Sequence, residues 1–328
     1  MSPFAYSRPA GIDEAVALAG PRSRFIAGGT NLVDLMKEEV ERPERLIDIN
    51  ALPLRELRDT KTGGLYVGAL VDNATLAASP QIVERYPLIS RAILAGASPQ
   101  LRNMASTGGN LLQRTRCHYF YDRAVPCNKR EPGSGCPAKD GLNRQHAILG
   151  ASEYCVAVHP SDLCVALAAL NAVVHVRGPQ AQRRLSFEQF HRLPGSRPQE
   201  DNILADDELV LGVELPGEGF PQHCAYLKVR DRASYAFALV SVAVGLLLDG
   251  GGRIAQVNIA LGGVAHKPWR DAEAEELLLG SAPETVHFQR CAEHFLRNAK
   301  PLSNNAFKVE LARRSIVRAL QQAAGGAR

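Results

Sequence analysis

The sequence has no hydrophobic run long enough to cross a bilayer. Its longest apolar stretch, from Tyr235 to Leu248, is too short for a transmembrane helix and is followed by Asp249 and glycines. The first ten residues also lack the apolar core of a secretory signal peptide. We therefore expect no membrane insertion and no export signal on this chain. An exported assembly would need a signal on a partner.

An excess of charge of one sign is also missing. The 38 Lys and Arg residues nearly balance 34 Asp and Glu residues, which leaves a formal net charge of +4 over 328 residues. No basic run or basic and aromatic stripe occurs, so we expect no nucleic-acid partner. The hydrophobic share of 45% is typical of a globular protein. The length allows two or three domains.

The chain contains two glycine motifs, neither of which fits the GxGxxG dinucleotide fingerprint or the Walker lysine pattern. The first lies between a predicted strand and a predicted helix and comprises Ala27, Gly28, Gly29, Thr30, Asn31 and Leu32. The second repeats the same residue types as Thr107, Gly108, Gly109 and Asn110. Paired glycines allow close backbone approach, and successive free amides bind phosphate. Two such turns could clamp a diphosphate, although a tight turn with a helix cap explains the first motif alone equally well.

Hydrophobic periodicity divides the chain into three segments. Residues 1–54 alternate helices at 12–18 and 32–40 with strands at 24–27 and 45–49. Residues 55–217 contain strands at 65–67, 155–158 and 172–176, and helices at 82–97 and 162–170. Residues 218–328 place strands at 225–229, 237–248 and 254–261 before helices at 283–298 and 306–323, which indicates an α+β domain.

The seven cysteines are an odd number in a long chain with no secretion signal, which disfavours a disulfide framework. Cys117, Cys127 and Cys136 crowd into a Pro/Gly-rich insertion at about 114–155, and Cys155 ends it. Four thiolates suit a [4Fe–4S] cluster. A structural zinc site is the rival, with His118 or His146 in place of one cysteine, but no two of these cysteines have the short spacing typical of zinc sites.

The remaining cysteines fit structural positions better. Cys164 falls inside the apolar helical pattern of 162–170, so we choose Cys155 as the fourth metal ligand. Cys224 and Cys291 are interpreted as structural. Lys129 and Arg130 beside the ligands would stabilise thiolates, but solvated loop charges or partner contacts explain them as well.

The two glycine motifs together resemble the FAD subunit of the xanthine dehydrogenase and carbon monoxide dehydrogenase family. His159-Pro160-Ser161-Asp162-Leu163 looks like the family motif whose aspartate contacts the flavin, and Lys228 matches its lysine near the isoalloxazine ring. The resemblance implies an FAD-binding fold of the vanillyl-alcohol-oxidase (PCMH) type, with two α/β subdomains and a C-terminal α+β domain of the CO dehydrogenase flavoprotein type. From the residues alone, Asp162 would be a helix cap and Lys228 a solvated strand residue.

The cysteine-rich insertion resembles that of the FAD subunit of bacterial periplasmic aldehyde oxidoreductases, which implies a [4Fe–4S] cluster. The expected partners are a molybdenum-cofactor subunit, a [2Fe–2S] subunit and an external electron acceptor. The expected function is electron transfer without a catalytic acid or base, in the periplasm by co-export or otherwise in the cytoplasm. The alternatives are a stand-alone flavin oxidoreductase and a non-enzymatic scaffold with structural zinc.

Overall fold

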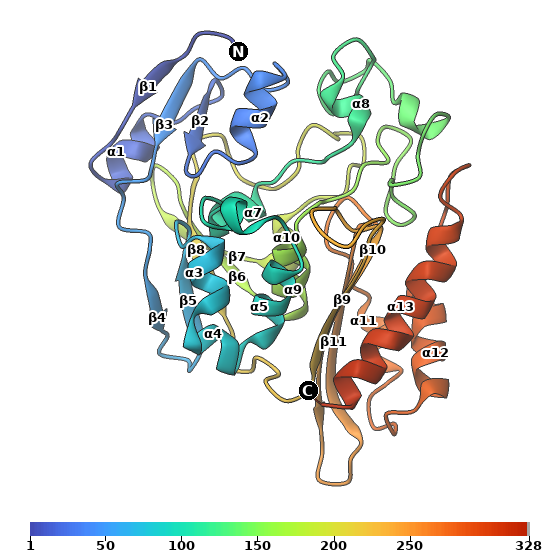
Figure 1. Cartoon of the computed structure of the whole chain (residues 1–328). Coiled ribbons are helices and arrows are strands. Elements are labelled where there is room, and N and C mark those ends of the chain that lie inside the picture. The colour runs from blue at the N-terminus through green and yellow to red at the C-terminus, as the bar shows by residue number, and fades with distance from the viewer. Residues whose placement is uncertain (327–328) are drawn as a thin grey trace.

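The structure is a computed structural model that describes residues 1–326, and in these residues the strands form three sheets (Figure 1). The N-terminal sheet has the order β1-β3-β2 and is parallel. Parallel neighbours need crossover connections, which helices provide here. The elements of this part are β1 (Ala5–Ser7), α1 (Ile12–Ala17), β2 (Ser23–Ile26), α2 (Leu32–Lys37) and β3 (Arg45–Asp48).

The second sheet is antiparallel, with the order β4-β5-β8-β6-β7. Its strands are β4 (Leu57–Asp59), β5 (Leu65–Gly68), β6 (Val173–Arg177), β7 (Gln182–Ser186) and β8 (Leu209–Leu215). Helices α3 (Asn73–Ala78), α4 (Pro80–Arg85), α5 (Pro87–Leu94), α6 (Pro99–Arg102), α7 (Thr107–Leu111), α9 (Asp162–Ala169) and α10 (Phe187–Phe190) belong to the same part of the chain. The predicted helix at 82–97 is two helices, because Pro87 interrupts the backbone hydrogen bonding and starts α5.

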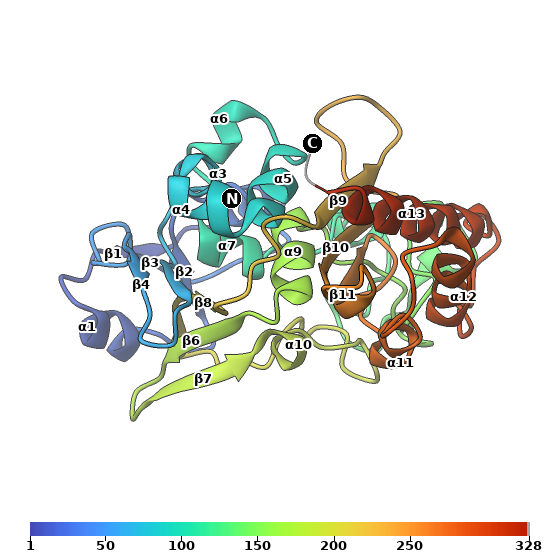
Figure 2. The same cartoon turned by 90° about the horizontal axis from the view of Figure 1, so that it is seen from below.

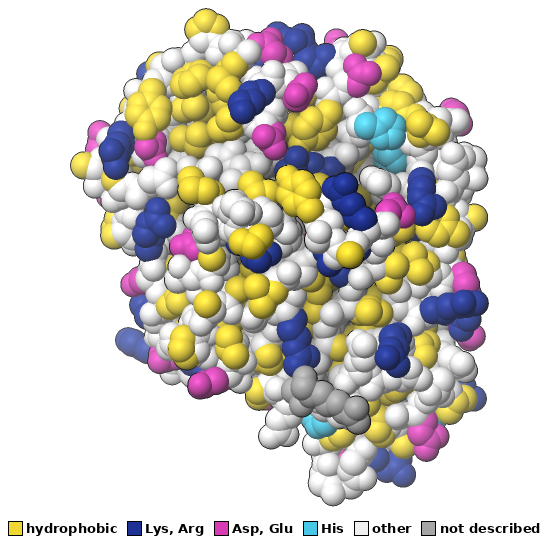
Figure 3. Space-filling model, in the orientation of Figure 1, with side chains coloured by type: hydrophobic (Ala, Val, Ile, Leu, Met, Phe, Trp, Pro, Cys, Tyr) yellow, Lys and Arg dark blue, Asp and Glu magenta, His cyan; other side chains and the backbone are white. Residues whose placement is uncertain are grey.

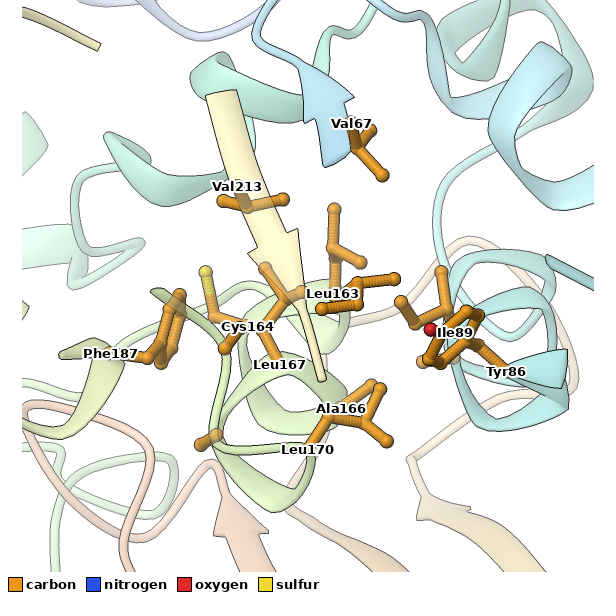
Figure 4. Close-up of a cluster of buried hydrophobic side chains, with 14 of the residues drawn as sticks. Val67, Tyr86, Ile89, Leu163, Cys164, Ala166, Leu167, Leu170, Phe187 and Val213 are labelled. Atoms are coloured by element: carbon orange, nitrogen blue, oxygen red, sulfur yellow. The ribbon is translucent and has the colours of Figure 1, made fainter. Parts of the chain in front are cut away.

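Helix α9 lies at the centre of the largest hydrophobic core. All of Leu163–Ala169 is buried, so the helix is apolar on every side and shows no polar face. Figure 4 shows Leu163, Cys164 and Leu167 surrounded by side chains from both the sheet and neighbouring helices, including Val67, Val213, Ile89 and Phe187. Cys164 is fully buried in this core, as the apolar helical pattern predicted.

The third sheet is antiparallel, with the order β11-β10-β9, and comprises β9 (Cys224–Val229), β10 (Val240–Leu248) and β11 (Ile254–Gly262). Helices α11 (Ala272–Glu276), α12 (Thr285–Phe295) and α13 (Phe307–Ala324) lie on its outer side (Figure 2). Helix α9 contacts β10 and β11. Because β10 is covered on both faces, its sequence is a continuous apolar run rather than an alternating one.

The cysteine-rich insertion has little regular structure. It contains only the short helices α8 (His118–Tyr121) and η1 (Pro137–Lys139). The predicted strand at 155–158 is wrong: the segment is irregular and makes isolated backbone contacts, such as Ala147 N to Val156 O at 2.8 Å. A short apolar run without a ladder partner does not form a strand.

In the described part of the chain, no helix combines the length and apolar character needed to cross a membrane. On the face drawn in Figure 3, Lys and Arg side chains gather near the centre and are elsewhere interspersed with acidic, hydrophobic and other residues.

Candidate cofactor sites

The first glycine motif forms one wall of a cleft of about 370 Å³, and Ala27 to Leu32 all line it. Gly28 lies directly against the loop before the second motif. A Cβ atom at Gly28 would be 1.7 Å from the carbonyl oxygen of Met104, so any side chain here would force the two loops apart. Gly29 has a φ of +71°, which disfavours other residues. The glycines therefore allow both the turn and the contact between the loops.

The backbone amides of this motif are available to a ligand. Among residues 1–326, the N–H groups of Gly28, Gly29, Thr30 and Asn31 have no protein acceptor. The Asn31 side chain accepts a hydrogen bond from the Arg114 amide at 3.0 Å, while its buried Nδ2 has no partner in the described residues. Successive free amides and an unpaired amide donor fit an anionic oxygen-rich group such as a diphosphate.

The second glycine motif is not the open turn that the sequence suggested, because it is the first turn of α7. Ser106 caps this helix and accepts a hydrogen bond from the Gly109 amide at 3.2 Å. The Thr107 amide donates to Val71 O and the Gly108 amide to Ala69 O. Ser106, Gly108 and Gly109 line the cleft, but Thr107 and Asn110 are buried beneath it. The motif thus contributes a close-packed wall, with its amides already bonded.

Thr107 and Asn110 make structural contacts. The Thr107 hydroxyl donates to Val71 O at 2.9 Å. The Asn110 side chain donates to Asn73 Oδ1 at 2.9 Å and accepts from the Ser161 hydroxyl at 3.3 Å. These contacts connect the floor of the cleft to the start of α9, where Asp162 lies.

Asp162 and Lys228 form a buried ion pair. Lys228 Nζ lies 2.7 Å from Asp162 Oδ2, and the lysine side chain is only 4% exposed. The Tyr226 hydroxyl donates to the other carboxylate oxygen at 2.6 Å. Both simple interpretations are therefore wrong: Ser161, not Asp162, caps α9, and Lys228 is not solvated.

A second cavity lies at this ion pair. Asp162, Ser161 and His159 line it from the segment before and at the start of α9, and Phe237 before β10 and Gly263 after β11 line it from the C-terminal part of the chain. Lys228 does not line this cavity, because its ammonium group is held by Asp162 and the Ala95 carbonyl. From the family resemblance we expected both Asp162 and Lys228 to lie beside the flavin. In the structure Asp162 lines a cavity, and Lys228 contacts Asp162 without lining that cavity.

A third, narrow cavity is surrounded by all four predicted metal ligands, Cys117, Cys127, Cys136 and Cys155. Cys164 is not among the residues that line it, and its thiol donates to Asn110 O at 3.4 Å. Thr115, Cys117 and His146 line both this cavity and the one at Asp162. The cysteine cavity and the Asp162 cavity are therefore direct neighbours.

The spacing of the thiols bears on which metal group they could hold. In the described residues, no three of these cysteines, with or without a histidine, place their ligand atoms within 4.8 Å of one another. Tetrahedral zinc with Zn–S bonds of about 2.3 Å needs thiolates about 3.8 Å apart. A four-iron cubane binds each thiolate at a different corner and so holds them farther apart. This arrangement fits the cluster better than a single zinc ion.

Burial controls the protonation of these ligands. It raises the pKa of Cys117 to about 12 and that of Cys155 to about 11. Burial, followed by His118, lowers the pKa of His146 to about 4, so its ring is neutral beside the Cys117 thiol at 3.1 Å. Without metal the Cys117 and Cys155 thiols are protonated at neutral pH, and metal loading would release their protons.

Sequence reasoning missed Glu41, Arg114 and Asp201, which line the cleft together. It left Lys129 and Arg130 undecided between solvated and electrostatic roles. The Lys129 side chain is 1% exposed and pairs with Asp201, and Arg130 donates to the carbonyls of Phe120 and Val125. Both are internal groups of the insertion.

Comparisons with known proteins agree with this arrangement. Residues 2–218 match the family described as "FAD binding domain in molybdopterin dehydrogenase", and residues 225–323 match "CO dehydrogenase flavoprotein C-terminal domain". The chain is 49% identical over 326 residues to the aldehyde oxidoreductase FAD-binding subunit PaoB of Escherichia coli, covering 98% of this chain and 99% of that protein. It is 26% identical to the carbon monoxide dehydrogenase medium chain of Hydrogenophaga pseudoflava, covering 98% of this chain and 96% of that protein.

Solved structures show the same fold. Carbon monoxide dehydrogenase from Hydrogenophaga pseudoflava superimposes with a TM-score of 0.77 at 25% identity, covering 99% of this chain and 98% of that chain. The expected fold, an FAD-binding domain followed by a C-terminal domain of the CO dehydrogenase flavoprotein type, is confirmed. The chain belongs to the family of FAD-binding medium subunits of the molybdenum hydroxylases.

Proposed function

We propose that this chain is the FAD- and [4Fe–4S]-carrying electron-transfer subunit of a molybdenum-dependent aldehyde oxidoreductase. The observation that carries the proposal is the adjacency of two cavities. One is surrounded by Cys117, Cys127, Cys136 and Cys155, the other contains Asp162, and Cys117 lines both. A cluster held by these thiolates would lie next to a flavin ring in the Asp162 cavity.

In this proposal the cleft binds the diphosphate part of FAD, and the Asp162 cavity binds the flavin part. The free amides of Gly28 to Asn31 hold the diphosphate, and Ser106, Gly108 and Gly109 close the opposite wall. Asp162 contacts the flavin side, and Lys228 acts by orienting Asp162. Bound FAD supplies the redox chemistry, while the protein binds it, orients it and excludes water. Thr107 and Asn110 support this site from below.

The partners follow from the family. One relative is named as the FAD-binding subunit of an aldehyde oxidoreductase and another as the medium chain of a carbon monoxide dehydrogenase. We propose a molybdenum-cofactor subunit that oxidises an aldehyde, a [2Fe–2S] subunit that relays electrons, and an external acceptor that FAD reduces. We propose domain boundaries at 1–54, 55–217 and 218–328, since the three sheets fall within these segments. Export together with a signal-bearing partner would place the complex in the periplasm.

An absorption spectrum with iron, sulfide and zinc analysis on anaerobically purified chain tests the proposal. Flavin bands near about 450 nm over a broad shoulder, with about four irons per chain, support it. Zinc without iron or flavin would leave the scaffold alternative. Aldehyde turnover by the single chain, without partners, would favour the stand-alone oxidoreductase.

A further inference from the structure

A buried ion-pair network joins the FAD cleft to the cysteine cavity. Its members come from three separate segments: Glu41 after α2, Arg114 and Lys129 in or just before the insertion, and Asp201 before β8. Glu41, Arg114 and Asp201 line the cleft, whereas Lys129 lines the cysteine cavity. The network is the direct polar connection between the two cofactor sites.

Lys129 is held at the cysteine side. Its side chain is 1% exposed, and its ammonium group donates to Asp201 and to the Pro198 carbonyl at 2.7 Å. Lys129 and Cys155 line the same narrow cavity, so the ammonium charge acts electrostatically on a ligand held there. A buried ammonium without a counter-ion is very unfavourable, and Asp201 supplies that counter-ion.

Arg114 is held at the cleft side. Its guanidinium Nε lies 2.9 Å from Asp201 Oδ2, and a terminal nitrogen pairs with Glu41. Its backbone amide donates to the Asn31 side chain of the first glycine motif at 3.0 Å. The guanidinium also lies 4.8 Å from the centre of the Phe120 ring, which belongs to the insertion. Arg114 therefore contacts both the first glycine motif and Phe120 of the insertion.

Asp201 is the only carboxylate shared by the two cations in the described chain, with one oxygen on each. Burial would raise its pKa, but Lys129 and Arg114 outweigh burial and lower it well below the usual range. His266 Nε2 lies 3.8 Å away, and burial keeps that ring neutral by lowering its pKa to about 4. Lys129 and Arg114 balance Asp201 and Glu41 in charge in the buried part of the network, and Arg24 pairs with Glu41 at 3.5 Å from the exposed rim.

We propose that Asp201 is a positioning residue that couples the two cofactor sites, fixing Lys129 beside the cluster and Arg114 at the wall of the FAD cleft. The inference rests on the proposed function, because it requires a redox cluster in the cysteine cavity. Its consequence is electrostatic: the charge balance at Asp201 sets how readily the cluster accepts an electron. Reduction potentials of iron–sulfur clusters respond to nearby net charge and to burial.

The test is a charge-balance cycle in the FAD- and iron-loaded full chain, with cluster potentials from EPR-monitored redox titration. Asp201→Asn leaves an extra positive charge and is expected to favour the reduced cluster at least tenfold, a rise of about 59 mV for one electron. Lys129→Met removes a positive charge and is expected to lower the potential. The double variant has the wild-type net charge and is expected to return close to the wild-type potential, because the two charge changes cancel.

FAD affinity provides a second readout. Asp201→Asn removes one of the two carboxylates that orient Arg114, so FAD is expected to bind about three- to tenfold more weakly, in line with one lost hydrogen bond. Lys129→Met leaves both carboxylates on Arg114 and is expected to keep wild-type affinity. Asp201→Glu keeps the charge and should stay close to the wild type in both readouts.

The outcomes separate this inference from the proposed function. Single variants that move the potential in the same direction, or not at all, in iron-loaded protein would overturn the coupling and leave the proposed function intact. Absence of iron from the wild type would overturn both. If Asp201→Asn does not accumulate as folded protein, Lys129→Met and Asp201→Glu still test the coupling. A lowered cluster potential in Lys129→Met together with an unchanged potential in Asp201→Glu supports it. Any other combination of results refutes it.

Discussion

Asp162 at the start of α9 and Lys228 near the end of β9 are joined by a 2.7 Å ion pair, although they lie 66 positions apart in sequence. Tyr226 from the same strand donates to the second oxygen of Asp162. The pair links the FAD-binding domain to the C-terminal domain. It also orients the carboxylate that lines the second cavity.

Asp162→Asn is expected to destabilise the fold by about 3–5 kcal/mol, because it leaves the buried Lys228 ammonium without a counter-charge. FAD content should fall with it, since the oriented carboxylate is lost. Urea unfolding and the flavin-to-protein ratio measure the two effects. The matched control is Glu44→Gln, which breaks the exposed Arg22–Glu44 pair and should change neither. Unchanged stability in Asp162→Asn would mean that Lys228 finds another partner.

Gly28→Ala is expected to lower FAD affinity at least about tenfold and to cost about 1–3 kcal/mol, as overpacking does. The added methyl group would lie 1.7 Å from Met104 O, so the glycine loop and the loop before α7 must separate. Isothermal titration with FAD and thermal unfolding check this. Gly20→Ala is the control, because nothing lies within 4 Å of a Cβ there. Wild-type FAD binding by Gly28→Ala would show that loop contact is unnecessary.

The sequence predicted which glycine motifs meet in the cleft more reliably than it predicted their local structure and contacts. Glycine pairs at 28–29 and 108–109 leave a pattern in sequence, and both line one cleft. Yet Thr107 to Leu111 forms a helix, because Ser106 caps it. Arg114, Lys129 and Asp201 leave no periodic signal. Their roles depend on ion pairs between segments brought together only by the tertiary fold, and the same is true of Lys228.

Cys136→Ser is expected to abolish the cluster signal while FAD remains bound, because Cys136 lines only the cysteine cavity and neither the cleft nor the Asp162 cavity. The insertion keeps other supports without metal. Asn305 donates to the His146 and Ala147 carbonyls at 3.1 and 3.2 Å, and Lys308 donates to the His146 carbonyl at 2.8 Å. EPR and flavin absorbance of one preparation measure both cofactors.

Cys164→Ala is the matched control for this experiment, because Cys164 lies in the core beside α7 and not in the cysteine cavity. It should retain about four irons per chain, with some loss of stability from the cavity it creates. Iron loss in Cys164→Ala would mean that Cys164, and not Cys155, is the fourth ligand. Loss of FAD together with iron in Cys136→Ser would make the insertion structural to the whole domain.

Stability should fall as the pH drops from about 6.5 towards 4, because buried histidines must gain a proton on unfolding. Burial lowers the pKa of His191 and of His266 to about 4, and burial with His191 lowers that of His159 further. Above the pKa of histidine in the unfolded chain, these rings are neutral in both the folded and the unfolded state, and stability does not change with pH. At pH 5 each of His191 and His266 should cost about 2 kcal/mol relative to pH 7, for an unfolded pKa of about 6.5.

Urea unfolding followed by circular dichroism at both pH values measures this loss of stability. His191→Gln should reduce the difference by that amount, whereas His287→Gln at a partly exposed position of α12 should leave it unchanged. Equal pH dependence in all three proteins would show that His191 is protonated in the fold.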